Sequence, residues 1–340
     1  MFESVPPRLY GGTERIVSYL TDELVHRGHD VTLFASGDSI TQARLVPVVE
    51  RATRFAPTTH AVLGAEFTRE LGLVFSHARD FDVIHCHVDY LAFPFDGLTP
   101  TPTVHTMHGR LDLPHLLPLY RQFRTVPFVS ISDAQRAPLE ALGVNWAGTV
   151  YHGLPVERYA FAPEDRGYLA FLGRIAPEKQ ADLAVEIARR VGLPLKIAAK
   201  VDATDREYFE QVVAPLLDDP LVEFVGEIGE EDKADFLGGA KALIFPIDWP
   251  EPFGLVMIEA MACGTPVVAR PCGSVPEIVV HERTGFLASS LVELAECVKR
   301  IDEIDRAECR RHVEERFSSG RMAEDYERIY RRLASRRRAA

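Results

Sequence analysis

The fold is decided by the stretch from Pro250 to Val268, which reads PEPFGLVMIEAMACGTPVV. Two prolines flank Glu251 and exclude regular helix or sheet there, so the stretch begins as a loop. A helix is predicted from about Gly254, because apolar residues recur on its successive turns. Gly264 is a typical helix end, and the β-branched run after it predicts a strand over Thr265–Val268.

A second buried strand is predicted over Ala242–Pro246, directly before this stretch. The unit is therefore strand, loop, helix, strand. In an open parallel sheet, ligands bind at the loop that leaves the carboxyl end of a strand. The helix behind the loop points its free N–H groups and the positive end of its dipole at the ligand. The stretch thus offers amides for an anion, and the carboxylates of Glu251 and Glu259 for hydroxyl groups.

The spacing of these two glutamates alone carries no information, because Glu178 and Glu186 show the same separation. Only Glu251 lies in a proline-bounded loop and is followed by Phe-Gly at a helix start. The stretch resembles the E-x7-E signature of the family 4 retaining glycosyltransferases, enzymes of the two-domain GT-B fold. The alternative interpretation is a surface loop followed by an ordinary helix.

The totals agree with a globular α/β enzyme. The chain has 340 residues, of which 46% are hydrophobic, and a net charge of -12. The acidic balance argues against nucleic acid or an anionic membrane as the main partner. Five cysteines without a C-x-x-C pair favour a reduced, cytoplasmic compartment. We find no apolar run of the ~20 residues that span a bilayer, and no signal peptide.

Strands alternate with helices in both halves, which predicts an α/β fold with two Rossmann-like domains. The resemblance implies that these domains face a central cleft. We expect an N-terminal acceptor-side domain over residues 1–152 and a C-terminal domain that binds a nucleotide-sugar over residues 153–320. A last helix over residues 321–340 would cross back to the first domain.

The beginning of the chain departs from this scheme. Met1–Leu9 is rich in proline and has no strand pattern, whereas Gly11 and Gly12 open a helix that runs to about Arg27. An α/β domain normally supplies a strand before such a helix, and the resembled family does so. The sequence lacks that first strand, which indicates either a start assigned too late or a truncated chain. A central place in the sheet would then be vacant.

Two features of this half are candidates for the site. Gly11 and Gly12 would let backbone approach a ligand at a helix N-terminus, although a plain tight turn explains them equally well. His108 follows a strand predicted over Thr103–Met107, where it could donate to a sugar hydroxyl. The resemblance implies that the glycine loop faces the donor's diphosphate or sugar, and that His108 lies beside the reacting centre.

A metal site is not expected. His85, His87 and His105 alternate on nearby strands, but no cysteine or carboxylate joins them at the spacing of a zinc site. The resemblance to the family likewise implies that no metal is required.

The second half carries two cations in a glycine- and proline-containing loop. Arg174 and Lys179 follow a strand predicted over Tyr168–Leu172. A guanidinium fork and an ammonium point charge can hold a diphosphate without a metal, although solvated surface charges would look the same. The loop is similar to the family's G-R-x-x-x-x-K-G run, except that Gln180 replaces the last glycine.

The resemblance implies the remaining donor contacts. The turn at Glu227 would pack against the nucleotide base. Glu259 would bind the ribose hydroxyls, and Glu251 would hold the sugar near the reacting carbon. The N–H groups near Phe253, Gly254 and Leu255 would meet the diphosphate, whose developing charge needs fixed donors. The family's usual account is front-face attack with the leaving phosphate taking the proton.

The sequence therefore predicts a retaining hexosyltransferase. Its donor would be a nucleotide-sugar, with UDP-glucose expected from the resemblance to bacterial small-molecule glucosyltransferases, including one that glucosylates the reduced pterin tetrahydrobiopterin. The acceptor, a small molecule or a glycan, stays open. Two alternatives remain: another GT-B enzyme such as a sugar-nucleotide epimerase or an inverting transferase, and a nucleotide-sugar-binding protein without turnover. A dehydrogenase is disfavoured because no G-x-G-x-x-G follows a strand.

Overall fold

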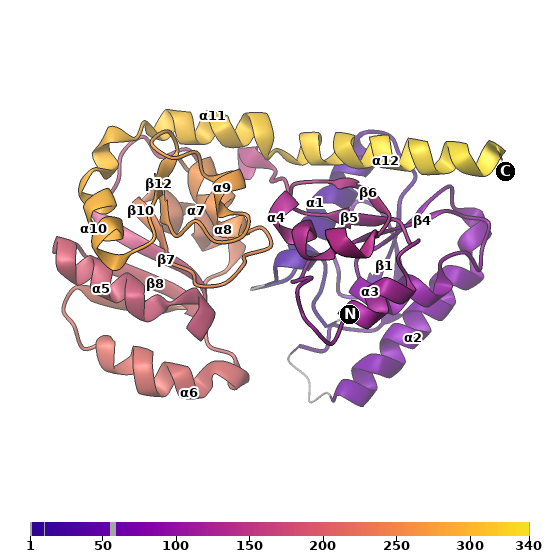
Figure 1. Ribbon diagram of the computed structural model, residues 1–340, viewed down its shortest axis with the longest axis horizontal. Coiled ribbons are helices and arrows are strands. Elements are labelled where there is room, and N and C mark those ends of the chain that lie inside the picture. Colours follow the sequence, from indigo (N-terminus) through magenta and orange to yellow (C-terminus); the bar gives the residue numbers. More distant parts are fainter. Residues whose placement is uncertain (1, 10, 55–58, 340) are drawn as a thin grey trace. The chain divides into compact units, whose positions relative to one another are not determined.

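Two units, each built on parallel sheet, make up the chain (Figure 1). The computed structural model describes residues 2–9, 11–54 and 59–339. Unit 1 comprises Met1–Gly153 and Ser319–Ala340, and unit 2 comprises Leu154–Ser318. Each unit is considered by itself below.

Unit 2 contains one six-stranded sheet, in which every strand runs parallel to its neighbours. Across the sheet the strands are β12 (Gly285–Leu287), β11 (Val267–Ala269), β10 (Ala240–Phe245), β7 (Tyr168–Arg174), β8 (Leu195–Lys200) and β9 (Val222–Gly226). The chain moves outward from β7 to β9, returns to β10 beside β7, and then moves outward the other way. The switch point of the sheet, where ligands bind in such folds, therefore lies between β7 and β10.

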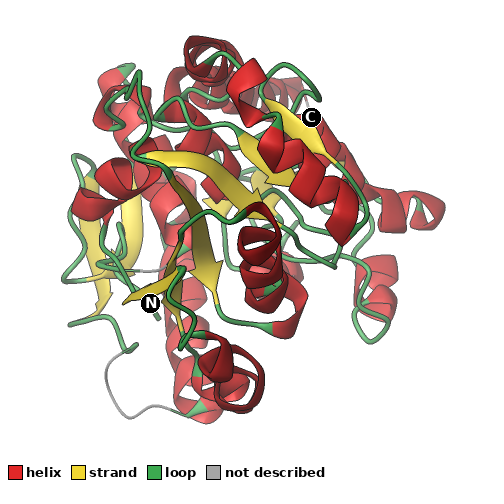
Figure 2. Ribbon diagram, turned by 90° about the vertical axis from the view of Figure 1, so that its left-hand side faces the viewer, coloured by secondary structure: helices red, strands yellow, loops and turns green. Residues whose placement is uncertain are grey.

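Helices cover both faces of this sheet (Figure 2). The helix α10 packs against α5, whereas α7 and α11 pack against α8. The helices of unit 2 are α5 (Ala181–Val191), α6 (Arg206–Tyr208), α7 (Glu230–Gly238), α8 (Leu255–Ala262), α9 (Val275–Ile278), α10 (Leu291–Lys299) and α11 (Arg306–Arg316). Strands β7, β10 and β11 are largely buried, which explains their continuous apolar runs, whereas the edge strand β9 alternates with exposed residues.

Two predicted helices of unit 2 are shorter than expected. The sequence pattern predicts one helix over Glu207–Leu217, whereas the structure has α6 followed by a π-helical turn at Phe209–Val213 and a 3-10 turn at Ala214–Leu216. Pro215 has no N–H group to continue an α-helical ladder. The helix predicted over Leu291–Ile304 ends at Lys299.

Unit 1 contains two separate parallel sheets. The smaller pairs β1 (Thr32–Ser36) with β2 (Arg44–Val49), and the larger runs in the order β3 (Ile84–Cys86), β4 (Thr103–Thr106), β5 (Phe128–Ser130) and β6 (Trp146–Thr149). The α-helices of unit 1 are α1 (Gly12–His26), α2 (His60–Ser76), α3 (Leu117–Gln122), α4 (Asp133–Arg136) and α12 (Ser319–Ala339). The helix α12 packs against α1, where the Arg27 guanidinium lies 2.6 Å from the Glu327 carboxylate.

Residues 2–9 form no strand, and β1 and β3 do not pair with each other among the described residues. Sequence analysis predicted that the strand preceding α1 is missing and that its place in the sheet is vacant. In the structure, unit 1 has two separate sheets, one ending at β1 and the other at β3. The strand β2 contains a proline, Pro47. Proline is tolerated there because β2 is at the edge of its sheet.

No helix in the described part of the chain is both long enough and apolar enough to cross a membrane.

Candidate active site

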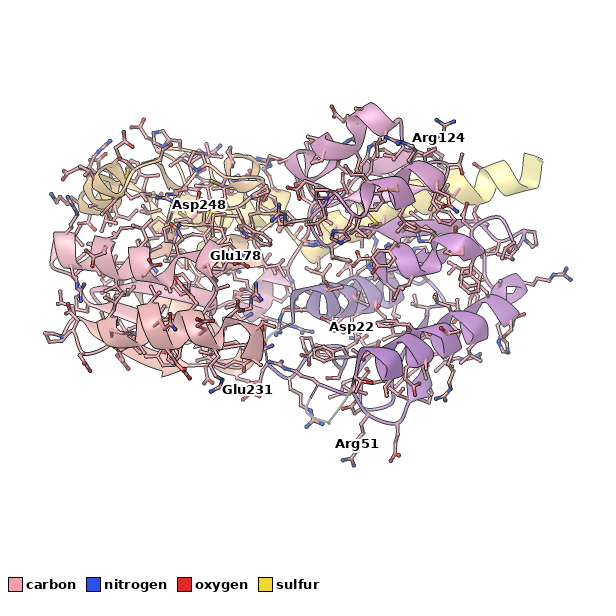
Figure 3. All side chains as sticks on the ribbon, turned by 60° about the horizontal axis from the view of Figure 1, so that its bottom comes forward. Asp22, Arg51, Arg124, Glu178, Glu231 and Asp248 are labelled. Atoms are coloured by element: carbon pink, nitrogen blue, oxygen red, sulfur yellow. The ribbon has the colours of Figure 1, made fainter. Side chains whose placement is uncertain are left out.

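Two loops meet at the switch point of unit 2. One follows β7 and carries Arg174 and Lys179, and the other follows β10 and carries Glu251. The Asp248 N–H donates to the Glu178 carbonyl oxygen at 2.9 Å and so joins them (both residues are labelled in Figure 3). Because β7 and β10 are parallel neighbours, their following loops leave the same edge of the sheet. The structure thus brings together the two loops that sequence analysis selected.

The Glu251 carboxylate is held by two side chains. It is 8% exposed, its Oε2 accepts a hydrogen bond from Trp249 Nε1 at 2.7 Å, and the Lys179 ammonium pairs with the same oxygen. Lys179 Nζ also lies 4.5 Å from the centre of the Trp249 ring. A buried carboxylate with a cation and an indole donor keeps one orientation, because both partners constrain the same oxygen. Sequence analysis missed Trp249, whose role depends on a rotamer that spacing does not encode.

The loop after β11 packs directly on the backbone of Glu251. Gly273 has φ +60, and a Cβ there would lie 2.3 Å from the Glu251 nitrogen. The Ser274 N–H donates to the Glu251 carbonyl oxygen at 2.9 Å, and Ser274 Oγ donates to the Phe253 carbonyl oxygen at 2.9 Å. Glycine is needed at residue 273 for both its conformation and this close approach. The loop thereby fixes the segment that carries Glu251.

The helix α8 begins directly after this segment. Gly254 precedes it in the left-handed region with φ +81, and Phe253 is 2% exposed and anchors the turn. Leu255 is the first residue of the helix. The amides of the first turn of a helix have no intrahelical acceptor, so this end attracts an anion. The predicted cradle of Phe253, Gly254 and Leu255 therefore follows Glu251 at the same sheet edge.

The Arg174 guanidinium is occupied by acidic side chains of its own loop and of the loop after β8. Its guanidinium lies 2.5 Å from Glu178 and 3.0 Å from Asp205, with Asp202 at 3.9 Å. The two cations of the loop therefore have different partners, since Lys179 pairs with Glu251. The diphosphate role predicted for Arg174 requires its guanidinium to exchange at least one of these carboxylates for phosphate.

Glu259 lies on the second turn of α8 and is 3% exposed. The Lys233 ammonium contacts its Oε1 at 2.7 Å, and the Tyr159 hydroxyl lies 3.3 Å from the same oxygen. The ammonium also lies 3.0 Å from Glu230. The Glu259 carboxylate is thus buried and paired with a lysine ammonium inside unit 2.

Glu227 is exposed and directly follows Gly226, which ends β9 with φ +86. It leaves the same edge of the sheet as the other loops, but β9 is the outermost strand on that side. The part of the nucleotide it would contact stays a prediction.

His108 lies after β4 in unit 1, among other buried rings. Its Nε2 is 2.9 Å from Nδ1 of His87, and its ring lies 5.4 Å from the ring of His152 in a stacked arrangement. Burial lowers the pKa of His108 to about 4 and lowers the pKa of His87 and His152 as well. Neutral rings suit this contact, in which one ring nitrogen donates and the other accepts. His108 is thus a neutral hydrogen-bonding group at neutral pH.

Gly11 and Gly12 stand where α1 begins. Gly12 is the first residue of the helix, and a Cβ on Gly11 would lie 2.7 Å from Pro7 Cβ. The close approach of Gly11 to Pro7 gives this glycine a packing role in addition to the predicted ligand role. Tyr10, which precedes the pair, lies outside the described residues.

Within the described ranges, no group of three or more His, Cys, Asp or Glu side chains is arranged to hold a metal ion. The histidines of unit 1 instead bond to one another and to hydroxyl groups; His85 Nε2, for example, lies 2.7 Å from Thr106 Oγ1.

Comparison with known proteins defines the class. The model of the glycosyl transferases group 1 matches residues 158–316, and the model of glycosyltransferase family 4 matches residues 10–158. With its two α/β units and its solved neighbours, the protein is a glycosyltransferase of the GT-B fold. More specifically, the chain belongs to glycosyltransferase family 4.

Three similar proteins illustrate the relationship. The D-inositol 3-phosphate glycosyltransferase of Mycolicibacterium smegmatis is 26% identical over 82% of this chain and 75% of its own length. AviGT4, a glycosyltransferase involved in avilamycin A biosynthesis, is 26% identical with a TM-score of 0.72 over 98% of this chain and 93% of its own. Anabaena HepE in complex with UDP and glucose shares the fold, with 18% identity and a TM-score of 0.74 over 95% and 96%.

Proposed function

We propose that the protein transfers a hexose from a nucleotide-sugar to a small-molecule or glycan acceptor with retention of anomeric configuration. The observation that carries the proposal is the Glu251 carboxylate, held by Lys179 and Trp249 at the switch point of the sheet and directly before α8. This arrangement offers a hydroxyl acceptor, a cation and helix amides along one sheet edge.

The chemistry of the transfer fits these groups. The leaving nucleoside diphosphate develops negative charge, which Lys179 and the amides at the start of α8 would stabilise. Glu251 would accept hydrogen bonds from the sugar hydroxyls near the reacting carbon. The acceptor would attack from the face that the diphosphate leaves, with the leaving phosphate taking its proton. No metal ion is needed in this scheme, because protein cations and amides meet the charge.

Other residues have supporting roles in the proposal. Glu259 would bind the ribose hydroxyls, Glu227 would contact the base, and Arg174 would join the diphosphate site after releasing one of its carboxylate partners. In unit 1, Gly11 and Gly12 would face the donor, and neutral His108 would hydrogen-bond to the transferred sugar.

UDP-glucose is the first donor to test. HepE has this fold and was solved with UDP and glucose. The acceptor is open, and the similarity to an inositol phosphate glycosyltransferase adds inositol phosphates to the small molecules and glycans to be screened.

The test begins with thermal unfolding in the presence of UDP, GDP, ADP and their sugars. A stabilising nucleotide is then used to compare the wild type with Glu251→Gln, whose amide keeps the shape but removes the charge. We expect turnover to fall by about 100-fold, whereas nucleotide affinity changes by less than about threefold. Asp248→Asn, on the same loop but exposed, is the matched control and should keep its turnover. The product's anomeric configuration, read by NMR, tests retention.

Three different results would each reject a different part of the proposal. If no nucleotide or nucleotide-sugar shifts the unfolding temperature, unit 2 has no donor site. If Glu251→Gln keeps the wild-type rate, Glu251 has no role in the transfer. An inverted product would reject the retaining mechanism alone.

A second candidate is a nucleotide-sugar-binding protein without turnover. The divided sheet of unit 1 favours it, since unit 2 could bind the donor while unit 1 fails to complete the reaction. Nucleotide-dependent stabilisation without release of UDP from UDP-glucose, either to water or to any acceptor in the screen, would select this candidate.

A further inference from the structure

A further cation, Arg270, stands at the sheet edge where Glu251 lies. It is the first residue after β11, which pairs in parallel with β10, so its loop leaves the same edge as the loop that carries Glu251. The two loops are in contact, because the Ser274 N–H donates to the Glu251 carbonyl oxygen at 2.9 Å. Arg270 is therefore close to the carboxylate that would hold the sugar.

The order of the strands places Arg270 beyond the sugar. Across the sheet, β8, β7, β10 and β11 are successive neighbours. Arg174 follows β7 and contacts Asp205, which follows β8, so the diphosphate contacts lie on that side of Glu251. Arg270 lies on the other side, one strand beyond β10. Neighbouring strands are ~4.8 Å apart, a distance comparable with the size of a hexose ring. Arg270 would thus face the side of the sugar that is turned away from the diphosphate.

Arg270 is also less neutralised than the two cations assigned to the diphosphate. The Arg174 guanidinium has three carboxylates within 3.9 Å, and Lys179 pairs directly with Glu251. The Arg270 guanidinium lies 3.8 Å from the carboxylate of Asp248, a side chain that is 65% exposed. Such an exposed pair is weak, because water and salt screen it. Arg270 therefore keeps most of its positive charge for another anion.

The side chain of Gln180 holds this guanidinium in place. Arg270 Nη1 donates to Gln180 Oε1 at 2.8 Å, and Gln180 Nε2 donates to Asp248 Oδ2 at 3.5 Å. Gln180 adopts φ +52, a left-handed conformation that is unfavourable for a residue with a Cβ. A neutral amide orients the guanidinium without cancelling its charge. The strained residue thereby fixes the direction of Arg270.

The guanidinium of Arg270 has hydrogen-bonding capacity that the fold leaves unused. Its Nε is buried without a hydrogen-bond partner among the described residues, although the side chain as a whole is 20% exposed. A buried donor without a partner is unfavourable, so a ligand that reaches it gains binding energy. The guanidinium is a planar fork that matches two oxygens of one carboxylate or phosphate. Its charge and its unused donor both favour an oxyanion.

We propose that Arg270 binds a carboxylate or phosphate group of the substrate that lies beside Glu251. The inference rests on the proposed function and names the substrate class: a substrate with a second anionic group besides the diphosphate. The group belongs either to the transferred sugar, as the C6 carboxylate of a hexuronic acid, or to the acceptor. Gln180 is a positioning residue, which acts through Arg270.

Titration calorimetry of the full-length protein with UDP-glucose and UDP-glucuronate tests the sugar as the source. UDP stands here for the nucleotide that stabilises the protein in thermal unfolding. The two ligands differ only at C6. If the sugar carries the group, UDP-glucuronate should bind at least about tenfold more tightly, and Arg270→Met should abolish this preference. Arg270→Lys keeps the charge without the fork and should retain a smaller preference.

A matched control makes the same change of charge elsewhere in unit 2. Arg189 lies near the end of α5, where its guanidinium is 2.6 Å from Glu186 and 2.7 Å from Asp219. Arg189→Met should therefore keep the wild-type preference. A loss of the preference in this control would assign the effect to net charge and overturn the role of Arg270.

Titration of the UDP-bound protein tests the acceptor as the source. The probes are inorganic phosphate and inositol 3-phosphate, with inositol as the uncharged control. If the acceptor carries the group, Arg270→Met should weaken the binding of both phosphate probes at least about tenfold, and UDP-glucuronate should bind no more tightly than UDP-glucose.

Gln180→Gly tests the positioning role. It keeps Arg270 but removes the amide that holds Nη1, so the ratio of the affinities for the charged and uncharged probes should fall by about threefold. A structural role alone would change both affinities equally and keep the ratio, which would refute the positioning role.

The two levels of the argument fail separately. If UDP binds and neither titration shows a preference that depends on Arg270, this inference is overturned and the proposed function stands. If the wild type binds none of the nucleotides, the proposed function is rejected, and the inference is rejected with it.

Discussion

Replacing Glu70 by glutamine should stabilise unit 1 at neutral and alkaline pH. Burial raises the pKa of the Glu70 carboxyl from 4.5 to about 7. The carboxyl is 7% exposed and its Oε2 lacks a hydrogen-bond partner among the described residues, so the folded state resists its ionisation more than the unfolded state does. Glutamine keeps the size of the side chain and has no charge to bury.

The magnitude follows from the pKa values. The pKa of Glu70 is higher in the folded state than in the unfolded state. The stability that the protonated Glu70 contributes is therefore fully present below about pH 4.5 and is lost as the pH rises to about 7. A difference of about 2.5 pH units corresponds to about 3 kcal/mol. Glu70→Gln should therefore match the wild type near pH 4.5 and exceed it by about 3 kcal/mol near pH 8. The buried histidines are present in both proteins, so their contribution cancels in the comparison.

The two tryptophans permit a measurement restricted to unit 1. Trp146 lies in unit 1 and Trp249 in unit 2, and the sequence contains no other. In a Trp249→Phe background, urea unfolding followed by Trp146 fluorescence reports on unit 1 alone. Glu66→Gln, on the same helix but bonded to exposed Arg69, is the control and should show no such pH-dependent gain. Parallel pH profiles for Glu70→Gln and the wild type would refute the raised pKa and the buried state of this carboxyl.

Three changes test the architecture of unit 2. Gly273→Ala places a Cβ 2.3 Å from the Glu251 nitrogen, so the loop must shift. Turnover should fall by about 100-fold while the circular dichroism spectrum stays unchanged. A wild-type rate would contradict the close approach of Gly273 to Glu251. Gln180→Gly removes the strain of a side chain in the left-handed conformation, φ +52, and should raise the free energy of unfolding by about 1 kcal/mol in urea titration. A lower free energy of unfolding would show that the contacts of the glutamine side chain outweigh the strain. Lys233→Met leaves the Glu259 carboxylate buried without its lysine and should lower the free energy of unfolding by about 3–5 kcal/mol, measured by Trp249 fluorescence. Adding Glu259→Leu should restore most of that free energy. If the double variant shows no recovery, the pairing is refuted.

Most of the sheet of unit 2 could be predicted from the sequence. The sequence pattern predicts a helix over about Ala181–Val191 and a strand over Leu195–Lys200, and α5 and β8 have these bounds. A clear apolar period ends at Gly192, which adopts φ +69. The helix α11 was missed because its sequence is strongly polar. It packs against α8 with only Cys309, His312 and Val313 buried, too few for a periodic signal.

The sequence predicted which loops form the candidate site, but not the contacts between residues within it. The positions of Lys179 and Glu251 follow from strand ends, which sequence patterns indicate. The hydrogen bond from Trp249 and the packing of Gly273 depend on backbone dihedrals and rotamers, which spacing does not encode. The resemblance placed a glycine where Gln180 stands, and its left-handed conformation gives the physical reason for that preference.

The pairing of the site's charges bears on how a metal-free donor site would respond to a diphosphate. Lys179 neutralises Glu251, and the guanidinium of Arg174 is shared by Glu178 and Asp205. Neither cation is therefore surrounded by water alone, and a diphosphate must compete with carboxylates that are already in place. Lys179 can contact a phosphate oxygen while it keeps Glu251, since an ammonium has three donors. Arg174 must rearrange, because Glu178 on its own loop and Asp205 on the loop after β8 hold its guanidinium and add negative charge near the incoming anion. In the proposed donor site, the lysine would consequently be the cation ready to contact the diphosphate, and the engagement of the arginine would depend on donor binding.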